Sequence, residues 1–430
     1  MNFESTLAPI REHLKDIEAG KTTRRAWLES LLERANEVER DVKAWITLDA
    51  DGARAAADTA DLKGTGGLLG GVPFAAKDNY DTHDLPTAYG SPIHAKTQPA
   101  RDATAIALMR MSGAILMGKT VTTEFAHRHP GATANPANPA HTPGGSSSGS
   151  AAAVAAGMTP LAFGSQTTGS VIRPAAYCGV VGYKPTHGQV NASGMMANTP
   201  SFDTVGLMSQ HVDDLVMARG ALLAESVNPL ESVSLRGSTI GISRGPFWSE
   251  TSDAMQELIE GSASALGALG ARIIEFDDQG AFDNLAEHAQ TISGFEFART
   301  MAHERLYAFD QLSDVLREGR MTDGLEADLQ SYTKAIRAVE RQRLGLDAAF
   351  DAVDVVITPP SPGSAPVGLH YTGSANLNLV WTTLHTPAVT IPAGRDTQGL
   401  PLGLQICGPR HSDIKVLAFS QQLHKELRAT

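Results

Sequence analysis

Hydrophobic and polar positions along the chain predict helices and strands in alternation. Thr22 and Thr23 are typical helix-capping residues. The apolar residues that follow them recur at the helical spacings of three and four, at Leu28, Leu31, Leu32, Ala35 and Val38. A strand is predicted at 44–49, a helix at 53–62, and a buried strand with a polar tip at 72–80. The pattern at 104–120 predicts a helix, a stop at Gly113 and a short strand.

The same alternation continues towards the C-terminus. Strands are predicted at 238–243 and 271–276, with a helix at 253–270 between them, and further apolar strands at 353–360 and 387–394. The residues from 295 to 350 predict a long, charged and mostly helical excursion. The predicted fold class is α/β, a single large domain (1–430) with a central mixed sheet that helices cover on both faces.

Composition excludes several classes of protein. The 430 residues carry a formal net charge of −12 and no run of Lys or Arg, so no nucleic-acid partner is expected. Two cysteines, Cys178 and Cys407, cannot build a disulfide framework. The first twenty residues lack the apolar core of a signal peptide, and no run of 18 apolar residues predicts a membrane span. A soluble, cytoplasmic protein with no membrane partner is expected.

The run GGSSSGSAAAVAAG, 144–157, has several interpretations. It is too short for a flexible linker and leads into a small-residue helical segment. It matches neither the Walker pattern nor the dinucleotide fingerprint. Residues 145–149 formally match the GxSxG nucleophile elbow, which needs a strand before it. Four prolines between 130 and 143 exclude a central strand there, so we interpret that match as accidental.

Two serines and a lysine offer a different chemistry. A serine that attacks a carbonyl needs a base within hydrogen-bond reach, and a buried lysine with a lowered pKa can be that base. Lys77 ends an apolar strand, Ser146 begins the serine run, and Ser170 follows a Gly-containing turn 24 residues later. Backbone N–H groups in such a turn can hold an oxyanion.

These residues resemble the amidase signature family of Ser–cisSer–Lys hydrolases. The resemblance is carried by the segments 70–82, 118–126, 143–157, 163–188, 353–362 and 401–409. It covers essentially the whole chain and implies the amidase signature fold, with a catalytic core at about 60–200 and a variable, substrate-pocket region at about 210–350. Phe295 to Tyr307 and Trp381 are expected to line that pocket.

The resemblance also implies roles for individual residues. Ser170 would be the acyl nucleophile, Lys77 the base, and Ser146 the bridging serine, which the family holds by a cis peptide bond. The N–H groups of Thr167, Thr168, Gly169 and Ser170 would form the oxyanion hole. The chain departs from the family pattern at two positions, Gln166 for an aspartate and Thr168 for a glycine. If position 168 required a positive φ, a threonine there would be strained.

The predicted activity is hydrolysis of the C–N bond of small-molecule amides, with ester or carbamate hydrolysis as a side activity. The Ser-Val-Ile-Arg-Pro form, 170–174, is similar to the malonamidase-like branch, in which Arg173 would bind a substrate carboxylate; a structural ion pair is the alternative. No metal or other cofactor is expected, and a homodimer is left open. The alternative function is an amidotransferase A-type subunit, which supplies ammonia to a partner acting on charged tRNA.

Overall fold

One mixed sheet organises the computed structural model, which describes residues 2–64 and 67–429. Its strands follow the order β1-β3-β2-β4-β6-β5-β10-β11-β9-β7-β8. The strands are β1 (Trp45–Leu48), β2 (Pro73–Lys77), β3 (Ile115–Thr120), β4 (Leu161–Gln166), β5 (Val181–Lys184), β6 (Thr204–Ser209), β7 (Thr239–Ile242), β8 (Arg272–Glu275), β9 (Val355–Thr358), β10 (Ala388–Arg395) and β11 (Pro401–Cys407). β2 runs parallel to β3 and β4, whereas β4 and β6 are antiparallel.

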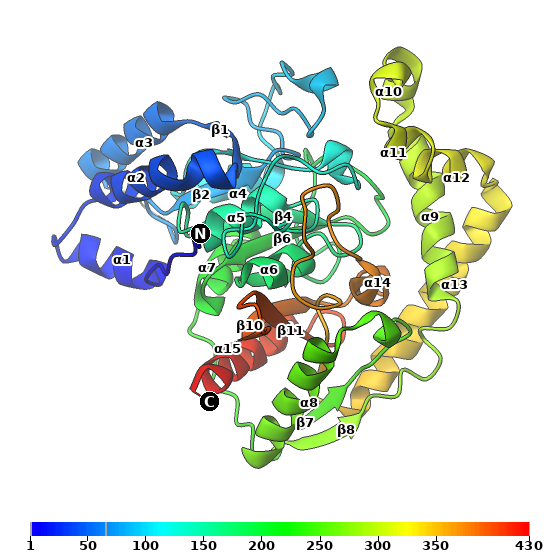
Figure 1. Ribbon diagram of the computed structural model, residues 1–430. Coiled ribbons are helices and arrows are strands. Elements are labelled where there is room, and N and C mark those ends of the chain that lie inside the picture. The colour runs from blue at the N-terminus through cyan, green and yellow to red at the C-terminus, as the bar shows by residue number, and fades with distance from the viewer. Residues whose placement is uncertain (1, 65–66, 430) are drawn as a thin grey trace.

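Helices cover both faces of this sheet (Figure 1). They are α1 (Ile10–Glu18), α2 (Arg24–Val42), α3 (Ala50–Lys63), α4 (Thr104–Met111), α5 (Ser148–Ala155), α6 (Ile172–Cys178), α7 (Val212–Leu223), α8 (Asp253–Ala268), α9 (Leu285–Thr300), α10 (Ala302–Tyr307), α11 (Asp314–Arg317), α12 (Arg320–Glu326), α13 (Leu329–Ala349), α14 (Asn376–Thr383) and α15 (Asp413–Ala429). α5 and α6 pack together on one side, and α7 packs with α4 and α15 on the other.

The amphipathic and apolar elements lie where the sequence patterns predict them. Thr23 caps α2 by accepting a hydrogen bond from the N–H of Ala26, and the predicted apolar face of α2 is buried. The helical excursion is α9 to α13, and Figure 1 shows α10 to α13 on the side of the molecule away from α2 and α3. The predicted α/β fold with a central mixed sheet is confirmed.

The sequence analysis did not predict four of the strands, β4, β5, β6 and β11. They are buried along their whole length, so their side chains show no alternation of apolar and polar positions. β4 and β6 also contain Gly and Ser, which are not typical strand residues. These strands matter for function because β4 and β6 follow β2 in the sheet and place the polar residues described below.

Candidate active site

Lys77 is the last residue of β2 and is completely buried. Its Nζ lies 2.7 Å from Ser146 Oγ and 2.8 Å from Ser165 Oγ. Burial lowers the pKa of Lys77 to about 7, against a smaller opposing effect of the Asp203 carboxylate. A lysine in this environment is a neutral amine at a pH slightly above 7 and can accept a proton. The sequence therefore placed Lys77 and Ser146 together correctly.

Two further polar residues at Lys77 were missed by the sequence analysis. Ser165, near the end of β4, accepts a hydrogen bond from Asn79 Nδ2 at 2.9 Å as well as contacting Lys77. Both residues are buried. The sequence feature that could have indicated Asn79 is the polar run Lys77-Asp78-Asn79, which directly follows a buried strand. Asp78 does not pair with Lys77, because its carboxylate forms a buried ion pair with Lys119 at 3.1 Å.

Ser146 lies in the glycine-rich turn that leads into α5. Gly145 has a φ of +63°, and a Cβ there would stand 2.7 Å from the ring of Pro174, so the turn packs directly on α6. The expected cis peptide bond is not found: among residues 2–64 and 67–429 every peptide bond is trans, the lower-energy form for a residue other than proline. This expectation from the resemblance is therefore wrong for this structure.

Ser147, the middle serine of the formal GxSxG match, has a structural role. Its Oγ accepts from the N–H of Ser165 at 3.2 Å and donates to the carbonyl of the same residue at 3.3 Å. No strand precedes it, since β3 ends at Thr120 and the next element is a short 3-10 turn at Glu124–Ala126. The geometry thus excludes a nucleophile elbow at this position.

The predicted oxyanion segment, Thr167 to Ser170, connects β4 to α6. Within the described chain its four backbone N–H groups have no hydrogen-bond acceptor. Thr168 lies outside the left-handed region, so the strain considered for a threonine at this position does not arise. A run of free donors before a half-buried serine is what an oxyanion hole requires.

The hydrogen bonds of Gln166 show what this residue does at the position where the family has an aspartate. Its Oε1 accepts from the N–H groups of Val171 and Ile172 at 2.8 and 3.0 Å. Its Nε2 donates to Thr382 Oγ1 at 2.9 Å, and the hydroxyl of Thr382 donates to the Thr168 carbonyl at 2.6 Å. Gln166 and Thr382 therefore fix the segment from the α14 side. Thr382 lies 216 residues from Gln166, and no sequence signal indicated it.

Asp203 fixes the same segment from the other side. Its Oδ1 accepts from Thr167 Oγ1 at 2.5 Å, and its Oδ2 accepts from the N–H groups of Asn198 and Thr199 at 2.6 and 2.8 Å. Burial raises the pKa of Asp203 to about 6, although these three donors favour the charged form. Asp203 immediately precedes β6, one of the strands that the sequence patterns did not reveal.

Ser170 follows the oxyanion segment and leads into α6. In the described part of the chain no hydrogen bond joins it to Ser146. Such contacts often tighten only when substrate binds. The catalytic role of Ser170 remains a prediction.

Arg173 is buried in α6, where its Nη1 donates to the carbonyl of Gly373 at 2.6 Å. Its Nε has no hydrogen-bond partner, and no described carboxylate pairs with the guanidinium. The alternative of a structural ion pair is therefore wrong. Of the residues expected to line the pocket, Trp381 packs edge-on against Phe282 and Phe295 stacks on Tyr332, and their part in substrate binding stays a prediction.

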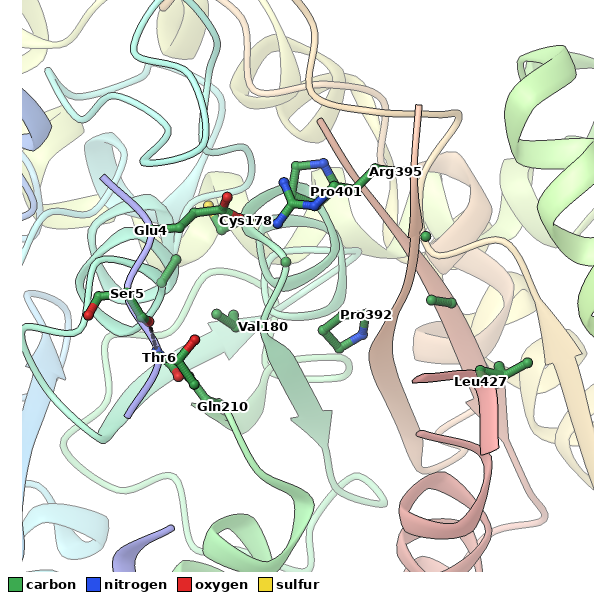
Figure 2. Close-up of a pocket in the computed structure, with 14 residues that line it drawn as sticks. Glu4, Ser5, Thr6, Cys178, Val180, Gln210, Pro392, Arg395, Pro401 and Leu427 are labelled. Carbon is green, nitrogen blue, oxygen red and sulfur yellow. Dashed lines mark hydrogen bonds and ion pairs between the residues drawn. The ribbon is translucent and has the colours of Figure 1, made fainter. Parts of the chain in front are cut away.

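Two other features lie apart from these residues. A cavity of about 460 Å³ opens between the N-terminal segment and β10 (Figure 2). Its lining includes Glu4 and Arg395 but none of the predicted catalytic residues. His83, Asp84 and Asp102 form the one metal-compatible cluster in the described ranges, and Arg110 pairs with both carboxylates. No described helix has the length and apolar character to cross a membrane.

Comparisons with known proteins identify the family of the chain. The family model described as Amidase matches residues 26–417. The chain is 32% identical to the A-type subunit of the Glutamyl-tRNA(Gln) amidotransferase of Lachnospira eligens, over 91% of this chain and 92% of that protein. A crystal structure of an amidase matches with a TM-score of 0.88 and 29% identity, covering 97% of this chain and 99% of the other. The native peptide amidase of Stenotrophomonas maltophilia matches with a TM-score of 0.85 and 28% identity, covering 99% and 98%.

The family match spans most of the chain, and the solved relatives share its fold along almost their entire length. The chain therefore belongs to the amidase family.

Proposed function

We propose that this protein hydrolyses the C–N bond of small-molecule amides through an acyl-enzyme intermediate on Ser170. The observation that carries the proposal is the buried Lys77, whose pKa is lowered to about 7 and whose Nζ is 2.7 Å from Ser146 Oγ. A buried amine that is neutral near neutral pH and contacts a serine hydroxyl is suited to remove a proton.

In the proposed first step, Ser146 passes the Ser170 proton to the Lys77 amine as Ser170 Oγ attacks the amide carbon. The carbonyl oxygen becomes an oxyanion, which the N–H groups of the segment Thr167 to Ser170 stabilise. The Lys77 ammonium then returns the proton through Ser146 to the amide nitrogen, and the C–N bond breaks. Water attacks the acyl-enzyme by the reverse proton path, which releases the carboxylic acid and restores Ser170.

Arg173 is the proposed contact for a substrate carboxylate, as in the malonamidase-like branch. It lies one helical turn after Ser170 and its Nε has no partner in the described chain. Guanidinium and carboxylate groups pair in a bidentate manner, which would orient the amide relative to Ser170.

The experiment is a substrate panel of small amides, esters and carbamates, with and without a second carboxylate, tested on the purified chain. We expect amide turnover by the wild type and none by Ser170→Ala. Ammonia or amine release that survives in Ser170→Ala would contradict the mechanism.

A second function is favoured by one observation, the 30 to 32% identity to A-type subunits of Glutamyl-tRNA(Gln) amidotransferases. In that case the chain would release ammonia from an amide for a partner that acts on charged tRNA. The net charge of −12 counts against direct contact with tRNA. The two functions differ in one measurement: an autonomous amidase turns over its substrate alone, whereas an amidotransferase component would do so only after its partners and charged tRNA are added.

A further inference from the structure

Three arginines on segments next to the proposed active site have no carboxylate partner in the described ranges. Arg128, Arg173 and Arg320 form no ion pair with any residue in the described ranges. The chain has 47 acidic residues against 35 basic ones, so carboxylates are not scarce. Arg173 is buried and Arg320 is half-buried, and buried cations normally pair with acids, so these two residues need an explanation.

The loop that carries Arg128 is fixed to the catalytic turn. The N–H of Thr123 donates to the carbonyl of Ser146 at 3.3 Å, and the Thr123 hydroxyl donates to the carbonyl of His127 at 2.6 Å. Phe125 and Ala126 have φ values of +46° and +54°, in the left-handed region that non-glycine residues rarely adopt. Strained turns of this kind are concentrated at functional sites. The loop presents the exposed Arg128 next to the catalytic turn.

Arg320 is the first residue of α12 and is connected to the Arg128 loop through Asn198. Its Nη1 donates to Asn198 Oδ1 at 2.6 Å, and Asn198 Nδ2 donates to the carbonyl of Phe125 at 3.0 Å. The N–H of Asn198 binds Asp203, which holds Thr167. Asn198 therefore connects Arg320 to the Arg128 loop and to the oxyanion segment.

The charge of Arg128 acts on both of the other guanidiniums. Burial lowers the pKa of Arg320 to about 10, and the charge of Arg128 acts in the same direction. Burial also lowers the pKa of Arg173; Tyr177 and Tyr371 act in the opposite direction, and Arg128 acts in the same direction as burial. Asp203 and Asp323 act on Arg320 in the opposite direction without forming an ion pair, and the Asp203 carboxylate already accepts three hydrogen bonds. An anionic ligand between the arginines would relieve this repulsion.

We propose that Arg128 and Arg320 complete, together with Arg173, a recognition site for an anionic group, so that the preferred substrates are amides bearing a free carboxylate. We call these three residues the arginine site. The inference rests on the proposed amidase function and adds two specificity-determining residues to it. In a protein of net charge −12 a local cationic site also selects acidic substrates over the neutral and cationic amides that a purely apolar pocket would admit.

The test compares succinamate, the monoamide of succinic acid, with succinamide, its neutral diamide of nearly the same shape. We expect the wild type to prefer succinamate in kcat/KM. Arg128→Gln and Arg320→Gln should each lower kcat/KM for succinamate roughly 10- to 100-fold, the value of a hydrogen bond to a charged group. In both variants the ratio of kcat/KM for succinamate to kcat/KM for succinamide should fall, because succinamide has no carboxylate for the arginines to bind. Arg40→Gln in α2, whose side chain is 92% exposed, is the control and should change neither value.

Direct binding gives a second measurement. Isothermal titration of succinate into Ser170→Ala should show binding that Arg320→Gln weakens and added KCl reduces. Equal turnover of both amides by the wild type, or equal losses on both in the arginine variants, would overturn the arginine site while leaving the amidase function intact. Absence of turnover and of Ser170 labelling would instead overturn the amidase function. In that case, loss of succinate binding in Arg320→Gln would still support the arginine site, and unchanged binding would overturn it.

Discussion

Ser165 Oγ lies 2.8 Å from the Nζ of Lys77, and the same amine contacts Ser146 Oγ. A neutral amine has two hydrogens and one lone pair. If Ser165 accepts one hydrogen, the lone pair is free to face Ser146. Ser165 is thus a positioning residue, held in turn by Asn79.

Removal of this contact should slow catalysis without weakening substrate binding. We expect Ser165→Ala to lower kcat about 10-fold, the effect of a misaligned proton transfer, with KM nearly unchanged. Steady-state kinetics on an amide measure this split. A rise in KM with normal kcat would show that Ser165 shapes the substrate pocket instead.

The pH dependence should report Lys77. Because burial lowers its pKa to about 7, the amine is protonated below pH 7 and neutral above it, so acylation should rise with pH through about 7 and then level off. Asn79→Asp places a carboxylate beside Ser165 and favours the ammonium form, so the midpoint should move to higher pH. A pH–rate profile of both proteins on one amide measures this shift, and coincident midpoints would argue against Lys77 as the base.

Lys77→Met removes the base from the same buried position. It should reduce amide hydrolysis more than hydrolysis of an activated ester, because an amine leaving group needs the returned proton and an activated ester does not. Near-normal amide turnover in Lys77→Met, or a wild-type pH profile in that variant, would be incompatible with the proposed mechanism.

Labelling should identify the nucleophile. A fluorophosphonate probe is expected to modify the peptide containing Ser170, which mass spectrometry can locate. Ser147→Ala is the control, because in the described chain the Ser147 hydroxyl bonds to the backbone of Ser165 and should not carry the label. An adduct on Ser147 would restore the GxSxG interpretation.

Asp203 should support the oxyanion segment. The Asp203 carboxylate accepts three hydrogen bonds, from Thr167 Oγ1 and from two backbone N–H groups. An asparagine at position 203 has a single acceptor oxygen, and its NH2 group would face at least one of these donors. We expect Asp203→Asn to lower kcat on the order of 100-fold, as for loss of an oxyanion-hole contact. Thr167→Val should act in the same direction and Thr167→Ser, which keeps the hydroxyl, should not. Equal activities of the two Thr167 variants would exclude this support.

Chelation tests the expectation that no metal takes part. The proposed chemistry is complete with side chains and backbone N–H groups, so protein treated with EDTA and freed of metal should keep its full activity. Activity that is lost and then restored by one specific divalent ion would contradict this. Asp102→Asn is a useful companion variant, since it removes one ligand of the His83 cluster and should leave turnover unchanged.

The sequence predicted what depends on local pattern and on recognisable motifs. It located α2, the β2 strand that ends in Lys77, and the pairing of Lys77 with Ser146. Neither Asp203 nor Thr382 could be found in this way, because each reaches the oxyanion segment from a distant part of the chain.

The order of β2, β4 and β6 in the sheet has a consequence for how the protein folds. Lys77 and Ser165 are 88 residues apart in the chain, and Asp203 enters only with the antiparallel β6. Contacts of such long sequence separation form late and slowly. A partly folded chain can therefore contain α2 and β2 in native form and still lack a base of the right basicity, since burial is what lowers the pKa of Lys77. Regain of amidase activity would then mark completion of the sheet rather than formation of its first elements.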